Sequence, residues 1–234
     1  VGRQTLGVKF MVRFLAALSV FAFVISAGAI PAKAQAIGAV SLVNIWAYGK
    51  APSASGWGDL YVADDVMTNH GLRTPSGGAL HVRFADDTDL RLGSDAEIVV
   101  DRYVYDQNAG LGEFSAEIAK GAFRFITGRM RKEGVRILTP VAVIAIRGTD
   151  FIVAVAGDGT TTVQVISGEV EITPRTGGAA VSVPAGETAR VAVASQSVET
   201  DVGAPTPDVG LDEDGGGAEG AGGGGDSGGG GDSH

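Results

Sequence analysis

The strongest constraint on this chain is a two-residue alternation of apolar and polar side chains between residues 36 and 200. Leu80, Val82 and Phe84 alternate with polar neighbours. The same rhythm recurs in residues 88–92, 123–125, 151–155, 163–165, 170–172 and 181–183. Alternation places one face of a strand on a core and the other in water. The Val, Ile, Phe and Thr residues that dominate suit a pleated surface, so we expect strands rather than helices.

Turn-forming residues separate these segments at short intervals. Ser76-Gly77-Gly78, Gly157-Asp158-Gly159 and Pro184-Ala185-Gly186 are typical turn sequences. Many short strands joined by regular turns predict a sandwich, a barrel or a solenoid. We therefore expect an all-β fold, a solenoid-like or sandwich-like array of short strands in a single domain.

Two segments invite a more specific prediction. In residues 113–126, apolar alternation stops at Lys120-Gly121 and then resumes, which favours a hairpin. In residues 141–146 every side chain is apolar. A short run that is apolar on both faces predicts a central strand covered above and below, and Pro140, which cannot donate to a ladder, belongs at its start.

The two ends of the chain differ from its body. Met11 and Arg13 precede an apolar run over residues 14–30, which ends at small-residue sites such as Ala32-Lys33-Ala34. This arrangement predicts a secretory signal peptide over residues 1–35 with its true start at Met11; an uncleaved membrane anchor is the alternative. Residues 201–234 hold fourteen glycines and eight acidic residues. We expect the segment 196–234 to be a disordered, acidic, glycine-rich tail.

Composition limits what the chain can do. It has no cysteine, three histidines and a formal net charge of −9. Thiolate metal sites and disulfides are therefore excluded, and an acidic chain lacks the basic face that nucleic acid requires. No Gly-x-Ser-x-Gly elbow, Walker lysine or histidine spacing typical of a metal site is present. We expect no enzyme, no metal and no cofactor.

Four segments in order carry a family resemblance. Residues 82–98 contain an acidic turn followed by Thr88-x-Leu90-x-Leu92, and residues 120–126 place Lys120-Gly121 before alternating apolar residues. Residues 137–153 contain a threonine-proline pair, an apolar run and then Arg-Gly-Thr-x-Phe. Residues 165–171 add a further strand pattern. Together these segments resemble the FecR family, and the signature residues of the third are Thr139, Pro140, Arg147, Gly148, Thr149, Asp150 and Phe151.

The resemblance implies an all-β envelope domain that takes part in sensing or regulation. It divides the chain into a leader (1–35), an aromatic β lead-in (36–68), a FecR-like β domain (69–195) and the tail (196–234). The best-known relatives also carry a cytoplasmic anti-sigma segment before a membrane helix. At most thirteen residues precede the apolar run here. Fold and compartment are therefore the expectations that transfer, and the iron-linked sigma-factor role is left open.

The most distinctive candidate site is the corner at residues 147–150. Gly148 is suited to a positive φ or a bulge, which could bring Arg147 near Asp150. A ligand-facing charge pair is one interpretation. We favour the other, an internal pair that fixes the corner, because an unpaired buried charge is strongly destabilising. On that interpretation Arg147→Ala should lower stability.

Three other clusters have both a functional and a structural interpretation. Asp86, Asp87 and Asp89 could hold calcium, but aspartates also cap ordinary turns, which we favour. The basic cluster could meet an acidic partner or be a solvated hairpin end; it comprises Arg124, Arg129, Arg131, Lys132 and Arg136. The lead-in aromatics could grip sugar or a partner, or cap the β core; they are Trp46, Tyr48, Trp57 and Tyr61.

These observations predict a periplasmic or secreted FecR-like protein. We expect a non-enzymatic binding or signal-input module that acts through contacts with an envelope protein. The alternative is a structural or adhesive surface protein that contacts glycan. A membrane is involved only through the leader, if the leader is not cleaved.

Overall fold

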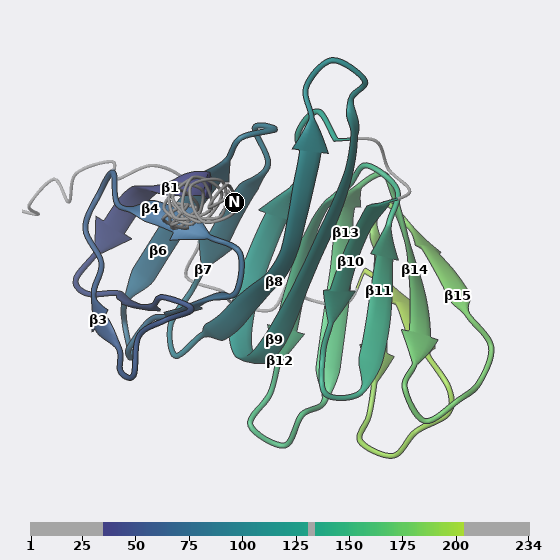
Figure 1. The fold of residues 1–234 in the computed structure, drawn as a ribbon. Coiled ribbons are helices and arrows are strands. Elements are labelled where there is room, and N and C mark those ends of the chain that lie inside the picture. Colours follow the sequence, from purple (N-terminus) through teal and green to yellow (C-terminus); the bar gives the residue numbers. More distant parts are fainter. Residues whose placement is uncertain (1–34, 131–133, 204–234) are drawn as a thin grey trace, which may run out of the picture. The chain divides into compact units, whose positions relative to one another are not determined.

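The computed structural model describes residues 35–130 and 134–203, and within them strands form one hydrogen-bonded sheet of seventeen members. The sheet consists of two ladders that share one long strand, β9 (Figure 1). Neighbours in ladder A are all antiparallel. Its order is β4 (Asp65–Met67), β1 (Ala36–Asn44), β6 (Ala79–Phe84), β7 (Asp89–Leu92), β9 (Leu111–Ile126), β12 (Asp150–Val155), β13 (Thr161–Ser167), β16 (Glu187–Val191) and β17 (Glu199–Val202).

Ladder B is antiparallel except where β9 pairs with β10 in parallel. Its order is β3 (Gly58–Asp59), β2 (Tyr48–Lys50), β5 (His70–Arg73), β8 (Glu97–Asp106), β9, β10 (Val135–Leu138), β11 (Ala142–Ile146), β14 (Glu169–Pro174) and β15 (Val181–Pro184).

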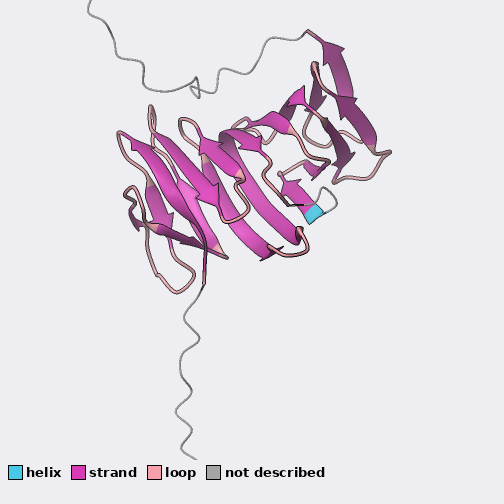
Figure 2. Ribbon diagram, turned by 90° about the horizontal axis from the view of Figure 1, so that it is seen from above, coloured by secondary structure: helices cyan, strands magenta, loops and turns pink. Residues whose placement is uncertain are grey.

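After β9 the chain adds hairpins to the two ladders in turn. The pair β10–β11 joins ladder B, β12–β13 joins ladder A, β14–β15 returns to B and β16–β17 to A. Figure 2 shows strands throughout the described chain, whose only helical residue is Gly134 in 3₁₀ geometry. The all-β array of short strands predicted from the alternation is therefore confirmed.

The predicted hairpin over residues 113–126 is wrong, because this segment is the single strand β9. Its first half pairs with β8 and β10 in ladder B, and its second half pairs with β7 and β12 in ladder A. The crossing occurs at Gly121, whose φ is 97°. A Cβ there would lie 2.3 Å from the Cα of Ala96. Gly121 therefore bends a continuous strand from one layer to the other instead of reversing it.

The core lies between the two ladders. Alternate side chains from both form one continuous buried cluster, as the period of two requires. A row of aromatic rings crosses it: Phe84 stacks on Tyr103 at 5.5 Å, Phe114 meets Phe125 edge-on at 6.1 Å, and Phe125 stacks on Phe151 at 5.4 Å. These rings come from strands of both ladders, so the row links the two layers.

The prediction that residues 141–146 are covered on both faces is also wrong. Strand β11 pairs on both edges, with β10 and β14, but only one of its faces is buried. Val143 and Ala145 are partly exposed on the other face, opposite Leu138 and Arg136 of β10. The apolar residues on the exposed face of β11 are there because Val favours strands and Ala is small, and not because that face is buried.

The strand-forming region is larger than the FecR-like segment. In the lead-in, β1 pairs with β6 and β2 pairs with β5, so these residues belong to the same two ladders. At the other end, β17 extends past the boundary predicted at residue 195. The predicted leader and the tail beyond Gly203 lie outside the described residues and stay predictions. Where the chain is described, no helix has the length and apolar character needed to cross a membrane.

Candidate functional site

The signature corner at residues 147–150 is built on backbone geometry. Gly148 adopts a φ of 67°, in the left-handed region that favours glycine. Thr149 next to it is buried; its hydroxyl donates to the carbonyl of Glu169 at 2.8 Å, and its N–H donates to the hydroxyl of Thr127 at 2.8 Å. The corner thereby ties the start of β12 to Thr127, which follows β9, and to Glu169 at the start of β14 in ladder B, as a structural element would.

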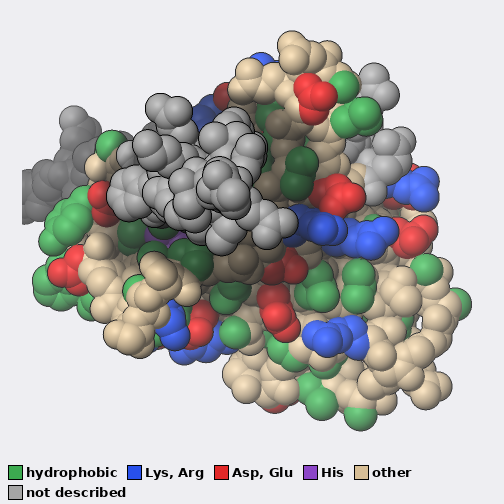
Figure 3. All heavy atoms as spheres, viewed as in Figure 1, with side chains coloured by type: hydrophobic (Ala, Val, Ile, Leu, Met, Phe, Trp, Pro, Cys, Tyr) green, Lys and Arg blue, Asp and Glu red, His purple; other side chains and the backbone are tan. Residues whose placement is uncertain are grey.

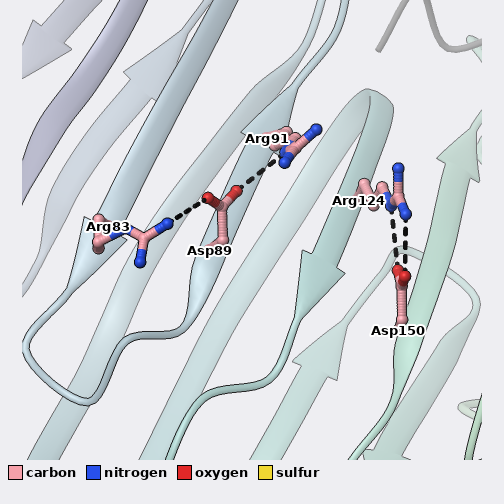
Figure 4. A network of polar contacts seen from close by, with 5 residues as sticks. All are labelled: Arg83, Asp89, Arg91, Arg124 and Asp150. Carbon is pink, nitrogen blue, oxygen red and sulfur yellow. Dashed lines mark hydrogen bonds and ion pairs between the residues drawn. The ribbon is translucent and has the colours of Figure 1, made fainter. Parts of the chain in front are cut away.

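The partner predicted for Asp150 is wrong. Asp150 receives a bidentate pair of hydrogen bonds from Arg124, with Nε at 3.0 Å and Nη2 at 2.9 Å (Figure 4). The side chains of Arg124 and Asp150 are 19% and 18% exposed. Arg147 instead projects into solvent, 62% exposed, with Glu171 at 3.8 Å. The β9–β12 register pairs Asp150 with Ile126, two residues from Arg124 on the same strand. The arginine that faces Asp150 therefore comes from the neighbouring strand β9 and not from the turn at Arg147.

The remaining signature residues also hold the fold. Thr139 is buried, and its hydroxyl accepts the N–H of Ala142 at 3.0 Å and the hydroxyl of Thr161 at 2.9 Å. Its carbonyl accepts from Arg175 at 3.1 Å. Pro140 lies between β10 and β11, before the strand begins, as its missing N–H predicts. Phe151 is fully buried in the aromatic row. Pro140 is exposed, but Thr139 and Phe151 are buried, so neither of these two side chains is presented to solvent as a ligand contact would be.

The acidic cluster at residues 86–89 is a folded polar turn. Asp86 is buried and accepts the N–H of Thr88 at 3.3 Å, the hydroxyl of Thr88 at 2.7 Å and the hydroxyl of Tyr103 at 3.0 Å. Burial, together with the Asp86 carboxylate, raises the pKa of Tyr103. Asp89 lies between Arg91 at 3.0 Å and Arg83 at 3.4 Å (Figure 4). Each carboxylate is engaged within the protein, which supports turn chemistry.

No arrangement for metal binding or catalysis is seen where the structure describes the chain. The described residues contain no group of three His, Cys, Asp or Glu side chains that could hold a metal ion. His70 is buried beneath the lead-in, and His81 lies partly exposed on β6, in the other ladder. His234 lies outside the described residues.

The described members of the basic cluster do not form one surface. Arg124 lies on the outer side of ladder A, engaged with Asp150. Arg129 pairs with Asp87 at 2.8 Å and donates to the carbonyl of Ala85 at 3.3 Å. Arg136 lies on the outer side of ladder B, where it lines a cavity of about 370 Å³ with the Arg102–Glu113 pair. Arg131 and Lys132 lie outside the described residues.

The four lead-in aromatics divide into two pairs. The guanidinium of Arg73 lies 4.4 Å from the ring centre of Trp57 and 5.1 Å from that of Tyr48, so these rings enclose a cation. Trp46 and Tyr61, in contrast, are 63% and 66% exposed. The sequence left two interpretations open for these rings. Tyr48 and Trp57 cap the fold, whereas Trp46 and Tyr61 face solvent.

The segments that carry Trp46 and Tyr61 pair with each other at the start of ladder B. In ladder B, Tyr48 pairs with Asp59, and the N–H of Leu60 donates to the carbonyl of Ala47 at 2.9 Å. Ala47 and Leu60 are both buried. Continuing this antiparallel register places Trp46 opposite Tyr61, on the outward face, where opposing Cβ atoms lie about 5 Å apart.

Three aliphatic residues extend this exposed surface. Ile45 and Val62, which adjoin Trp46 and Tyr61 in sequence, are each 59% exposed, and Leu42 on β1 is 38% exposed. We call Leu42, Ile45, Trp46, Tyr61 and Val62 the lead-in patch. Figure 3 shows hydrophobic side chains beside acidic ones at the left edge of the view, where Figure 1 draws the end of β1. Sequence reasoning missed Leu42, Ile45 and Val62. The sequence did contain a signal for Ile45 and Val62. Residues 45–47 and residues 60–62 are each three consecutive apolar residues, which cannot all face the core of a regular strand.

Ile45 is held in a strained backbone conformation. Its φ is 67°, which costs a residue with a Cβ about 1–2 kcal/mol and is rarest for β-branched side chains. Strict alternation from buried Ala47 would place Ile45 on the inner side, so the left-handed residue is where the pattern breaks. Strain that presents an apolar side chain to water is a mark of a functional surface.

Comparison with known proteins identifies the class of this two-ladder fold. The family described as FecR protein matches residues 70–171, which confirms the resemblance. This segment of the chain is FecR-like. No curated protein matches the chain.

Among solved structures, the chain is similar to two crystal structures of a proposed anti-sigma factor from Parabacteroides distasonis ATCC 8503. The identities are 20% and 21%, with a TM-score of 0.45 in both comparisons. Each match covers 56% of this chain and 59% of the solved chain.

Proposed function

We propose that this protein is an exported, non-enzymatic FecR-like module that receives a signal in the bacterial envelope through contact with another protein. The match of residues 70–171 to the FecR family supports a regulatory rather than a catalytic role. The leader predicted over residues 1–35 supports a periplasmic or secreted location.

The observation that carries the proposal is the lead-in patch. In the signature corner and the acidic turn, charged and polar groups are engaged inside the protein. The lead-in patch instead leaves two aromatic and three aliphatic side chains open to water on neighbouring segments. A concentration of exposed large apolar side chains of this kind supports a site for another macromolecule.

The test is crosslinking of the full-length protein in the envelope of the bacterium that produces it. A photoreactive residue at position 62 should trap a distinct protein partner, whereas the same residue at exposed position 104 should not. Amino-terminal sequencing of the same material should begin after Ala32. Recovery of the protein in the cytosol, or no protein partner at any surface position, would remove the proposal.

A structural or adhesive role on glycan is the second candidate. Its supporting observation is the pair Trp46 and Tyr61, since adjacent exposed rings can stack on sugars. Retention on purified envelope polysaccharide, with no protein trapped from position 62, would favour this role over the first.

A further inference from the structure

The charges around the lead-in patch distinguish it from a simple apolar surface. Residues 36–69 contain one lysine, Lys50, and three aspartates, Asp59, Asp64 and Asp65. Asp59 lies opposite Tyr48 in ladder B, on the same face as Trp46 and Tyr61. The Asp64 carboxylate accepts the N–H of Tyr61 at 2.8 Å, and Asp65 follows it at the start of β4. The aspartates therefore border the patch.

Asp59, Asp64 and Asp65 form no ion pair with any described residue, unlike Asp87, Asp89 and Asp150, which each face an arginine. Exposed carboxylates elsewhere, such as Asp101, share this property; what distinguishes the three is their place beside exposed apolar side chains. Asp59 and Asp65 are exposed and Asp64 is half-buried. The patch thus combines open apolar side chains with carboxylates that form no ion pair. The nearest cation across β2 from Asp59 is Arg73, whose guanidinium is enclosed by Tyr48 and Trp57.

From this combination we infer that the lead-in patch binds a segment of another protein in which apolar side chains are flanked by Lys or Arg. Apolar residues of the partner cover Trp46, Tyr61, Ile45 and Val62, and its cations neutralise the bordering aspartates. The inference rests on the proposed protein-binding function and names the surface and the kind of partner.

The same charges argue against the other occupants. A second copy of this chain, paired across a two-fold axis, would bring like aspartates together at the rim. An anionic lipid surface or acidic polysaccharide would meet the same repulsion. Strand addition at this end is weak, because the edge strands β3 and β4 are only two and three residues long. Side-chain contact with a cationic, apolar segment is what the surface fits.

The direct test measures binding of two short synthetic peptides to the purified full-length protein by fluorescence anisotropy. Both peptides carry the same Leu and Phe residues; one alternates them with Lys and the other with Glu. The Lys peptide should bind at least about tenfold more tightly, and its affinity should fall when salt is raised from about 0.01 M to about 0.15 M, since screening shortens the reach of exposed charges.

Variants locate the binding. Trp46→Ala combined with Tyr61→Ala should weaken the Lys peptide by about tenfold or more, because aromatic anchors dominate such surfaces. Asp59→Asn combined with Asp65→Asn should remove most of the preference for Lys over Glu. The matched control is Val104→Ala with Leu111→Ala, two similarly exposed apolar residues on β8 and β9, which should bind as wild type.

One variant separates loss of binding from loss of folding. Ile45→Gly removes a patch side chain and also relieves the positive φ, so it should unfold at the wild-type temperature or above while binding the Lys peptide several-fold more weakly. Retained affinity in a folded Ile45→Gly protein would count against the patch.

Several outcomes overturn the inference. They are equal binding of the Lys and Glu peptides, wild-type affinity in the Trp46/Tyr61 variant, salt-independent binding of a neutral oligosaccharide that requires Trp46, and a patch-dependent dimer in sedimentation. The envelope experiment distinguishes the two proposals. If the Trp46/Tyr61 variant still traps the wild-type partner, the inference fails and the proposed function stands; if wild type traps nothing from any position, the proposed function fails.

Discussion

The signature corner and the lead-in patch lie in the same pair of ladders but differ in where their side chains make contacts. Those of the corner bond within the protein, and those of the patch face solvent. At the corner, Thr149 donates a hydrogen bond to Glu169 of β14, and Asp150 accepts hydrogen bonds from Arg124 of β9. At the patch, apolar side chains and aspartates face water with no partner of opposite charge among the described residues. The FecR match covers residues 70–171 and so includes the corner but excludes the patch. Residues that identify the family therefore hold the fold, and the surface suited to binding lies outside them.

The largest effect that would support this contrast is expected at the strand crossing. Gly121→Ala should destabilise the protein by about 4 kcal/mol, because it combines a left-handed φ with a backbone clash against Ala96. Chemical denaturation measures the change. Gly157→Ala is the control, since nothing lies within 4 Å of its added Cβ. If both variants are equally stable, Gly121 is not what bends β9.

The Arg124–Asp150 pair tests whether the corner is structural. Arg124→Ala should cost about 2 kcal/mol of unfolding free energy, less than for a fully buried pair because each side chain is about one-fifth exposed. Loss of the peptide binding described above should not accompany it. A double-mutant cycle with Asp150→Ala isolates the interaction.

The matched control is the Arg102–Glu113 pair, whose side chains are 65% and 59% exposed. Arg102→Ala should cost less than about 1 kcal/mol. Were Arg124→Ala to melt like wild type yet lose a binding partner, the corner would be a ligand site and the contrast between the two regions would be reversed.

His70 offers a way to weaken the patch region alone. Its side chain is buried beside Gly49 of β2, and its Nδ1 has no hydrogen-bond partner among described residues. Burial lowers the pKa of His70 from its usual 6.5, and the nearby Asp64 carboxylate opposes that shift. The unfolded chain therefore binds the proton more readily than the folded protein. Stability contributed by neutral His70 is present above pH 6.5 and is lost as the pH falls below it.

The measurement is amide hydrogen exchange in β2 and β5 as a function of pH. Protection there should decrease below pH 6.5, by less than the effect of Arg124→Ala, while β12 and β13 stay protected. His70→Gln should flatten the dependence. A decrease of equal size in His70→Gln would assign it to another group.

Sequence reasoning recovered what depends on local pattern. The alternation predicted strands, Gly148 was assigned a positive φ, and the aspartates at residues 86–89 were assigned to a turn. What it could not supply depends on strands distant in sequence. The partner of Asp150 is an arginine 26 residues away, brought beside it by the β9–β12 register. Exposure of Ile45 and Val62 depends on a backbone irregularity, which apolar side chains alone do not reveal.

Arg147 should give the smallest effect, and it sharpens the contrast within the corner itself. The sequence-based expectation was that Arg147→Ala lowers stability through an internal charge pair. The side chain is instead 62% exposed and lies 3.8 Å from a Glu171 carboxylate that is itself 42% exposed. Such a pair contributes little, so Arg147→Ala should change the free energy of unfolding by less than about 0.5 kcal/mol. Gly148→Ala, one residue on, should cost about 1–2 kcal/mol because of its positive φ. A large loss in Arg147→Ala with no loss in Gly148→Ala would mean that charge, rather than backbone geometry, holds the corner.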